Sequence, residues 1–583
     1  METFSHKYLF IFVRMMRLPA TLALLLCYFI PMAQNAGRYD VVITEIMADP
    51  DPPVGLPNAE YIELKNKSNR PINLQGWRLT TTTSRSGALP SFTLQPDSFV
   101  IVTTAAQVAA LSPFGTTISV ASFPALVNTG TTLSLLSADN KTIHAIAFTD
   151  NWYKDAAKAK GGYSLEMIDA TNPCAGAENW RASTHGRGGG TPGKINAVAA
   201  VLKDETPPAL VNITLGDATT LLINFSEPVD SNSAVAFANY RLQPAVEIVG
   251  VKVLNPLLQQ VQIKLAAPLD SNTIYTLTVL QVADCSGNVL GTRNRLPVGR
   301  PQTIEANDII INEILFNPKP GGHDYIELYN RSHKVVDIST LMLANRSSTG
   351  GLANSRKIAQ TPFYLFPGDY LVLTENAAIL TKQYFTPTIE AVLQTSLPAM
   401  PDNEGSVVLL NNQNTIIEEI RYNENWHHAL IADKEGVALE RIDPNGPSAE
   451  KTNWHSASST VGYGTPTYKN SQYLQRFTKG FINILPKTFS PDGDGFDDVT
   501  TIQYITASNG FVANVYIYDA NGRQVRHLVK NSLLSRQGQW QWNGVNDNNQ
   551  RLPIGTYVIV TEMFNDKGEK QLFKNAVVLA HRF

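Results

Sequence analysis

The chain has 583 residues, 43% of them hydrophobic and 17% charged, and it contains 38 glycines and 34 prolines. That length predicts three to five domains, and that composition favours short strands joined by many turns over long charged helices. The formal net charge of −3 provides no overall basic field to hold nucleic acid or an anionic bilayer, so we expect no nucleic-acid partner.

The first 33 residues have the pattern of a signal peptide. Positive residues precede an apolar run at 21–30, which is too short to span a bilayer comfortably, and Ala33 offers a cleavage site. Two alternatives stay open. One is an anchor that is retained uncleaved, and the other is a lipoprotein modified at Cys27, although Leu25 and Leu26 stand where small residues are expected. After cleavage we expect no integral membrane span in the mature chain.

The chain contains a long internal duplication, which is the strongest signal of its organisation. Five residues recur 274 positions later: Trp152, Glu166, Asp169, Trp180 and Pro192 correspond to Trp426, Glu440, Asp443, Trp454 and Pro466. The beginnings of the copies also match, because ITEIM and EYIEL at 43–64 parallel INEIL and DYIEL at 311–328. We infer two copies of one domain.

Alternating apolar residues, many β-branched residues and frequent turns predict strands throughout. We therefore expect an all-β protein made of tandem Ig-like β-sandwich domains. The predicted parts are a first repeat at 34–200, a middle domain at 201–301, a second repeat at 302–470, a linker at 471–480 and a C-terminal domain at 481–583.

Several motifs resemble known families. Through ITEIM, EYIEL and NLQGWRL, the repeats resemble lamin-tail domains, although the second repeat has DISTLMLAN where the first has NLQGW. The middle domain resembles bacterial Ig-like domains of surface-layer type through FSEPVD and DCSGNVL. The C-terminal domain is similar to the gliding-motility-associated C-terminal domain through FSPDGDGFDD, WNGVNDNN and LPIGTYV. This combination resembles a lamin-tail protein of the Bacteroidetes, and it implies export by the type IX secretion machinery.

No catalytic apparatus is recognisable, since an HExxH zinc motif, a Walker loop and a GxSxG elbow are all absent from the sequence. Glu45 with Glu63, and Glu313 with Glu327, fall on neighbouring predicted strands. Such pairs serve glycosidases, but they also form structural hydrogen bonds or bind a cation or a partner. We favour the structural interpretation and expect a protein that is not an enzyme.

The repeated tryptophans have two interpretations: Trp152, Trp180, Trp426 and Trp454. An exposed coplanar row of them would stack on sugar rings, whereas buried rings would anchor the core of each repeat. Their identical spacing in the two copies favours the core.

The acidic stretch DGDGFDD at 492–498 is the candidate metal site. Calcium prefers several oxygen ligands, so we predict that it binds the side chains of Asp492, Asp494 and Asp498 and the carbonyl of Phe496. The stretch departs from an EF-hand, because Gln503 stands where the bidentate glutamate would be. An acidic turn without an ion is the alternative, and we expect no other cofactor.

Removal of the signal peptide leaves two cysteines, Cys174 and Cys285. Both lie in glycine-containing turns of an exported chain, so we predict one disulfide between them.

The predicted function is that of a non-catalytic adhesion or structural protein, secreted or displayed at the cell surface, which contacts protein or glycan partners. The alternative is a carbohydrate-binding accessory protein for polysaccharide utilisation. We also predict that residues from about 481 to Phe583 are a sorting module. Their last strand would leave an edge that the export machinery recognises by strand addition.

Overall fold

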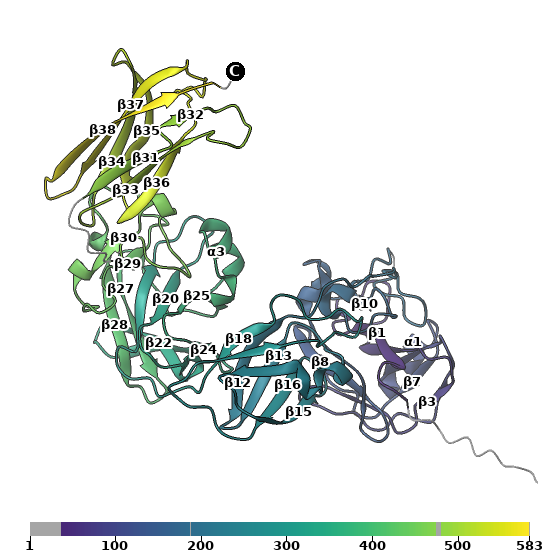
Figure 1. Ribbon diagram of the computed structural model, residues 1–583. Coiled ribbons are helices and arrows are strands. Elements are labelled where there is room, and N and C mark those ends of the chain that lie inside the picture. The colour runs from purple at the N-terminus through teal and green to yellow at the C-terminus, as the bar shows by residue number, and fades with distance from the viewer. Residues whose placement is uncertain (1–35, 187, 474–479, 582–583) are drawn as a thin grey trace, which may run out of the picture. The chain divides into compact units, whose positions relative to one another are not determined.

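The computed structural model describes residues 36–186, 188–473 and 480–581. The predicted signal peptide, Cys27 and most of the predicted linker lie outside the described residues. Within them, no helix combines the length and the apolar character needed to cross a bilayer. The chain divides into two compact units, 1–204 and 205–583, and strands dominate both (Figure 1). This confirms the all-β class.

The first repeat is a sandwich with a six-stranded sheet in the order β11-β10-β1-β2-β6-β7 and a three-stranded sheet in the order β4-β8-β9. All pairs are antiparallel except β6 with β7. The elements are β1 (Val41–Met47), β2 (Tyr61–Asn66), β3 (Ile72–Asn73), β4 (Arg78–Thr80), β5 (Thr93–Leu94), β6 (Phe99–Thr103), α1 (Val108–Leu111), β7 (Thr117–Ser119), β8 (Gly130–Leu136), β9 (Thr142–Thr149), β10 (Leu165–Met167) and β11 (Trp180–Ala182).

The second repeat has the same plan, with a six-stranded sheet β26-β25-β20-β19-β29-β30 and a four-stranded sheet β23-β22-β27-β28. The extra strand β23 has no counterpart among the strands of the first repeat. The elements are β19 (Ile309–Leu315), β20 (Tyr325–Asn330), β21 (Val336–Asp337), β22 (Leu341–Arg346), β23 (Leu352–Lys357), β24 (Tyr364–Leu365), β25 (Tyr370–Thr374), α3 (Ala377–Gln383), β26 (Val392–Gln394), β27 (Glu404–Asn411), β28 (Ile416–Asn423), β29 (Leu439–Arg441) and β30 (Trp454–Ser456).

The middle domain has a four-stranded sheet β12-β13-β16-β15 and a three-stranded sheet β14-β17-β18 around a separate core. Its residues Ile223, Val261 and Leu277 are fully buried. The elements are β12 (Leu210–Asp217), β13 (Thr220–Phe225), α2 (Ser231–Ala234), β14 (Tyr240–Gln243), β15 (Ile248–Leu254), β16 (Gln260–Leu265), β17 (Tyr275–Val279) and β18 (Arg295–Val298).

The C-terminal domain has a three-stranded sheet β31-β33-β36 and a five-stranded sheet β32-β38-β37-β34-β35, the yellow end of the ribbon in Figure 1. Its core includes Trp542, Ile502 and Ile559. The elements are β31 (Phe481–Leu485), β32 (Thr488–Phe489), β33 (Thr500–Ile505), β34 (Val512–Asp519), β35 (Gln524–Leu533), β36 (Gln537–Trp542), β37 (Gly555–Phe564) and β38 (Lys570–Leu579).

The central strand of each repeat is buried along its whole length. All seven residues of β1 and all seven of β19 are buried, which means that both faces of each six-stranded sheet are covered. One face packs on the smaller sheet, as a near-continuous apolar strand requires. The other face lies under loops and a short helix. The glutamates discussed below lie on this second face.

The tryptophans that begin β11 and β30 anchor the two cores, as the sequence predicts. Trp180 is 1% exposed and Trp454 is 3% exposed, and they pair with equivalent residues, Met167 and Arg441. Trp152 is only partly buried, with its ring centroid 6.3 Å from that of Trp180. The described tryptophans of the repeats therefore form no exposed row for sugar.

We expect Trp180→Ala and Trp454→Ala each to destabilise the repeat that carries it by about 3–5 kcal/mol, because each substitution leaves a large cavity in a closed core. Chemical denaturation followed by circular dichroism measures the loss. Trp152→Ala is the matched control, and a smaller loss is expected because that ring is only partly buried. An equal loss for Trp152→Ala and Trp180→Ala would contradict this assignment of the core.

Candidate functional site

Each repeat buries a row of three glutamates across neighbouring strands of its six-stranded sheet. In the first repeat Glu45 of β1 lies opposite Glu166 of β10 on one side and Glu63 of β2 on the other. The second repeat has the same register, and its row consists of Glu440, Glu313 and Glu327. All six side chains are fully buried. Like charges directly opposite each other are destabilising in a sheet, so each row needs compensation.

A loop that follows β11, which we call the first strap (188–198), compensates the first row. The N–H of Thr191 and the hydroxyl of Ser164 donate to Glu45 Oε1, at 2.9 and 2.6 Å. The N–H of Gly193 donates to Glu63 Oε2, and the hydroxyl of Thr191 donates to Glu166 Oε1 at 2.8 Å. The row therefore binds the strap through backbone and hydroxyl donors.

The equivalent loop after β30, the second strap (462–472), binds the second row. The N–H and hydroxyl of Thr465 donate to Glu313, at 2.9 and 2.7 Å to the nearer oxygens. Thr467 N–H donates to Glu327 Oε2 at 2.7 Å, and Gln472 N–H donates to Glu440 Oε2 at 2.8 Å. The same positions of the strap thus serve both repeats.

The strap approaches the sheet closely enough to restrict its own residues. A Cβ at Gly190 would lie 2.5 Å from Glu45 Oε1, and a Cβ at Gly464 would lie 2.8 Å from the hydroxyl of Tyr325. Gly193 has a φ of 77°, and Thr467, at the equivalent position, has a φ of 72°. A β-branched residue in the left-handed region is strained, so the hydrogen bond of Thr467 to Glu327 holds it there.

Burial and mutual repulsion raise the pKa values of Glu45 and Glu63 in the first row and of Glu313 and Glu327 in the second. Burial first, and the charge of Glu166 second, raise the pKa of Glu45 to about 7. In the second row burial and the charge of Glu440 raise the pKa of Glu313 to about 8. The pKa values of Glu63 and Glu327 are also well above the usual range for the same reasons. Each row therefore retains protons at a pH where free glutamate is fully ionised.

The structure brings together the pairs predicted from the sequence and adds a third member to each. Glu166 and Glu440 belong to the duplicated pattern, and that recurrence was the signal for them, but only the strand register shows that they complete the rows. A glycosidase needs carboxyl groups that reach a substrate. These groups are sealed from solvent and occupied by the straps, which supports the structural interpretation.

The first strap also has the glycine spacing G-x-G-x-x-G, at 188–193. A dinucleotide-binding loop of this kind passes from a strand into a helix, whose N–H groups hold phosphate. Here no α-helix follows within the described residues up to 230, and two N–H groups of the stretch donate to glutamates instead. The stretch is therefore part of the strap rather than a phosphate site.

We expect the free energy of unfolding of the first repeat to fall as pH rises from about 5 to 8. The folded pKa of Glu45 is about 7, above its ordinary value of 4.5, so its contribution to stability is full below 4.5 and is lost as pH rises through 7. Glu45→Gln should flatten this dependence and stabilise the repeat at pH 8 by roughly 1–3 kcal/mol. The substitution keeps Oε1, which accepts hydrogen bonds from Tyr61, Ser164 and Thr191. It replaces Oε2, which has no hydrogen-bond partner.

Denaturation at a series of pH values measures this effect. Glu178→Gln in the same repeat is the control, because that side chain is 82% exposed in an ion pair with Lys154, and such pairs contribute little. An unchanged slope in Glu45→Gln, or the same flattening in the control, would contradict the assignment.

The predicted calcium ligands lie in a turn before β33. Asp492, Asp494 and Asp498 each place an oxygen within 4.8 Å of the others. Asp498 accepts hydrogen bonds from the N–H groups of Gly493 and Gly495, at 2.6 and 2.9 Å. The turn therefore brings the three carboxylates together, as the sequence indicates. Calcium binding by these residues and by the carbonyl of Phe496 stays a prediction.

If this turn binds calcium, millimolar Ca²⁺ should raise the melting temperature of the C-terminal domain by a few degrees, because a ligand that binds only the folded state stabilises it. Asp498→Asn should abolish the increase, since it removes one charge from the hard oxygen set. Differential scanning calorimetry with and without EDTA measures both effects. An equal increase in Asp498→Asn, or none in the original chain, would favour the acidic turn without an ion.

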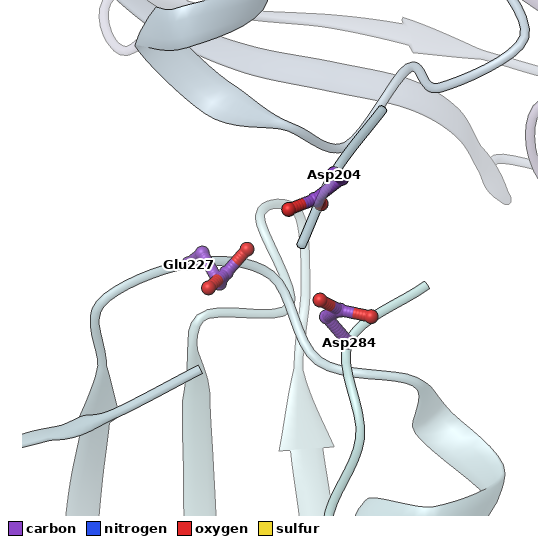
Figure 2. Close-up of side chains that lie close together, drawn as sticks. All are labelled: Asp204, Glu227 and Asp284. Atoms are coloured by element: carbon purple, nitrogen blue, oxygen red, sulfur yellow. The ribbon is translucent and has the colours of Figure 1, made fainter. Parts of the chain in front are cut away.

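Another group of carboxylates, Asp204, Glu227 and Asp284, lies close together (Figure 2), with one oxygen of each within 4.8 Å of the others. Asp284 is 2% exposed and already accepts hydrogen bonds from the N–H groups of Ser286 and Asn288. The motifs FSEPVD and DCSGNVL, which contain Glu227 and Asp284, were interpreted only as marks of the fold. No local pattern therefore marked this group, and the two hydrogen bonds account for Asp284 alone.

The two cysteines of the mature chain lie in turns. Cys174 is buried in the turn after β10, and Cys285 is exposed in the turn after Asp284. Both cysteines are disulfide-bonded, and their pairing with each other stays a prediction.

Comparison with protein families identifies two kinds of domain. The Lamin Tail Domain family matches residues 34–150 and 302–424, which contain most of each repeat. The CHU_C Type IX secretion signal domain matches residues 483–579. No curated protein matches the chain.

Solved structures show only distant likeness. An S-layer protein, rSbsC(31-844), is 12% identical over 64% of this chain and 54% of its own, with a TM-score of 0.16. PorZ, a surface component of the type-IX secretion system of Porphyromonas gingivalis, is 10% identical over 78% of this chain and 56% of its own, with a TM-score of 0.16. A Ca²⁺-stabilised, ice-binding adhesin of an Antarctic bacterium is 9% identical over 94% of this chain and 100% of its own, with a TM-score of 0.12.

The chain spans about half the length of the first structures that it matches, between 45% and 56%. TM-scores this low do not support a shared overall fold or function for the whole chain.

Proposed function

We propose that this chain is a non-catalytic adhesion or structural protein of the cell surface, because the Lamin Tail Domain model matches both repeats and the type IX secretion signal model matches the C-terminal domain. The signal domain delivers it through the type IX machinery, and the other three domains act as binding or spacing modules that contact protein or glycan.

The observation that carries this proposal is how the repeats use their carboxylates. The six glutamates that most resemble catalytic pairs are buried and hold the straps in place. The same arrangement occurs twice, as expected for a structural element of the domain rather than for one active site. A duplicated sandwich of this kind supports a role in contact and display.

The last strand of the C-terminal domain supports recognition of this domain by the export machinery. Along Lys570–Leu579, β38 pairs with β37 on one side. On its other side the ladder with β32 covers only Val578 and Leu579. Most of β38 therefore presents an edge, and edges of this kind accept an added strand from a partner.

We expect removal of residues 481–583 to leave the protein in the periplasm of a host that uses type IX secretion, because the domain matched as the secretion signal would be missing. Cell fractionation with immunoblotting measures the distribution. The matched experiment fuses 481–583 to a periplasmic reporter, which should then reach the surface or the medium. Unchanged delivery of the truncated chain, or retention of the fused reporter, would assign the domain to the binding modules instead.

The alternative function, a carbohydrate-binding accessory protein for polysaccharide utilisation, needs an accessible sugar site. The tryptophans do not supply it, because Trp180 and Trp454 are buried in the cores. A sugar site must therefore be sought in other aromatic residues.

A further inference from the structure

A pocket of about 620 Å³ lies in the second unit, between the middle domain and the second repeat. Its size is ordinary for a site that binds a small ligand. The second repeat contributes four aromatic residues from β24, β25 and the segments beside them, and the middle domain contributes polar residues of β12 and of the loop before β18. The aromatic residues are Phe363, Tyr364, Phe366 and Tyr370, and the polar residues of the middle domain include Asn212 and Arg293.

Of the four aromatic side chains, the two tyrosines are held in place by contacts within the protein. All four are half-buried. The hydroxyl of Tyr364 accepts a hydrogen bond from the N–H of Leu215 at 3.0 Å. The ring of Tyr370 packs on that of Tyr329, with centroids 4.8 Å apart. Rings fixed in this way lose little conformational entropy when a ligand packs on them.

The charges at the pocket favour a neutral ligand. Of the described residues that line it, Arg293 is the one cation, and it forms an ion pair with Glu390 at 2.7 Å. Asp369 accepts a hydrogen bond from the N–H of Phe366 at 3.3 Å. An anionic ligand would meet two carboxylates and a guanidinium that is already paired. Hydroxyl groups, in contrast, donate to carboxylates and accept from guanidinium and amide groups.

The first repeat has only part of this aromatic surface. Leu94 of β5 pairs with Ile72, and Leu365 of β24 pairs with Val336. Ile72 and Val336 are equivalent residues of the two repeats, so Leu94 and Leu365 are equivalent as well. The positions of Tyr364 and Phe366 are then held by Thr93 and Gln95, and that of Asp369 by Ser98. Phe92 and Phe99 stand where Phe363 and Tyr370 are, so only Tyr364 and Phe366 are particular to the second repeat and are not needed for the fold of a repeat.

We propose that this pocket binds a neutral oligosaccharide. A pyranose ring has apolar C–H faces that pack on aromatic rings, and a rim of hydroxyl groups that matches the carboxylates of Glu390 and Asp369, the amide of Asn212 and the guanidinium of Arg293. The inference rests on the proposed surface function and gives it a partner class, because a site of this kind would attach the displayed protein to a glycan.

The experiment measures binding of the full mature chain to cello-, xylo-, manno- and chito-tetraose, with tetragalacturonate as the anionic comparison, by isothermal titration calorimetry. We expect saturable binding of at least one neutral tetrasaccharide. Phe366→Gln should weaken it, and Tyr364→Thr with Phe366→Gln should weaken it at least about tenfold. Both changes install the residues that the first repeat already carries at these positions, so the repeat should fold, as a thermal melt would show.

Phe385→Ala is the matched control, because that aromatic side chain is 69% exposed in the same repeat and lies outside the pocket lining. It should leave the affinity unchanged. The proposal is overturned if no neutral tetrasaccharide binds at millimolar concentration, if only tetragalacturonate binds, or if the double variant binds as tightly as the original chain. A chain that reaches the surface and attaches cells but binds no sugar would retain the proposed function and overturn only this inference.

Discussion

Each repeat closes around three glutamates that share one buried row. Their side chains lie on the face of the six-stranded sheet that does not pack on the smaller sheet. Their oxygens accept hydrogen bonds from the N–H and hydroxyl groups of the strap. The strap adds no strand to the sheet, so these bonds satisfy its buried backbone groups. The close approach of Gly190 and Gly464 and the left-handed backbone of Gly193 and Thr467 follow from this contact. Burial and the neighbouring glutamate charges raise the pKa values of Glu45 and Glu313, and the hydrogen bonds from the strap partly offset that increase.

The two repeats preserve this row but have diverged beside it. The N–H of Ile43 donates to Nδ1 of His144 at 2.9 Å, and burial lowers the pKa of that histidine to about 3, so a neutral imidazole accepts the bond. In the second repeat the equivalent N–H, of Ile311, donates to Glu418. The charge of Glu418 is compensated by Arg441, at 2.7 Å, which stands where the first repeat has Met167. The buried arginine offsets the cost of burying the Glu418 carboxylate, so the two substitutions belong together.

The residues at the aromatic pocket also differ between the two repeats. Thr93 and Gln95 of the first repeat stand where the pocket of the second has Tyr364 and Phe366, whereas Phe92 and Phe99 keep an aromatic ring where Phe363 and Tyr370 are. Both repeats thus keep the glutamate row and its strap, while residues beside the pocket differ. This is expected where loops carry contacts and the interior carries stability. The C-terminal domain, which matches the type IX secretion signal domain, has a core of its own.

The sequence by itself determined the all-β class, the duplication, the two kinds of matched domain and the role of Trp180 and Trp454 as core anchors. These follow from local signals, because side chains alternate along a strand and a repeated spacing requires no knowledge of pairing. Only the tertiary structure placed Glu166 and Glu440 in the rows, brought the straps onto them and assembled the aromatic pocket. Those features join residues that lie far apart in the chain, and strand register and burial, which no local pattern encodes, decide which of them meet.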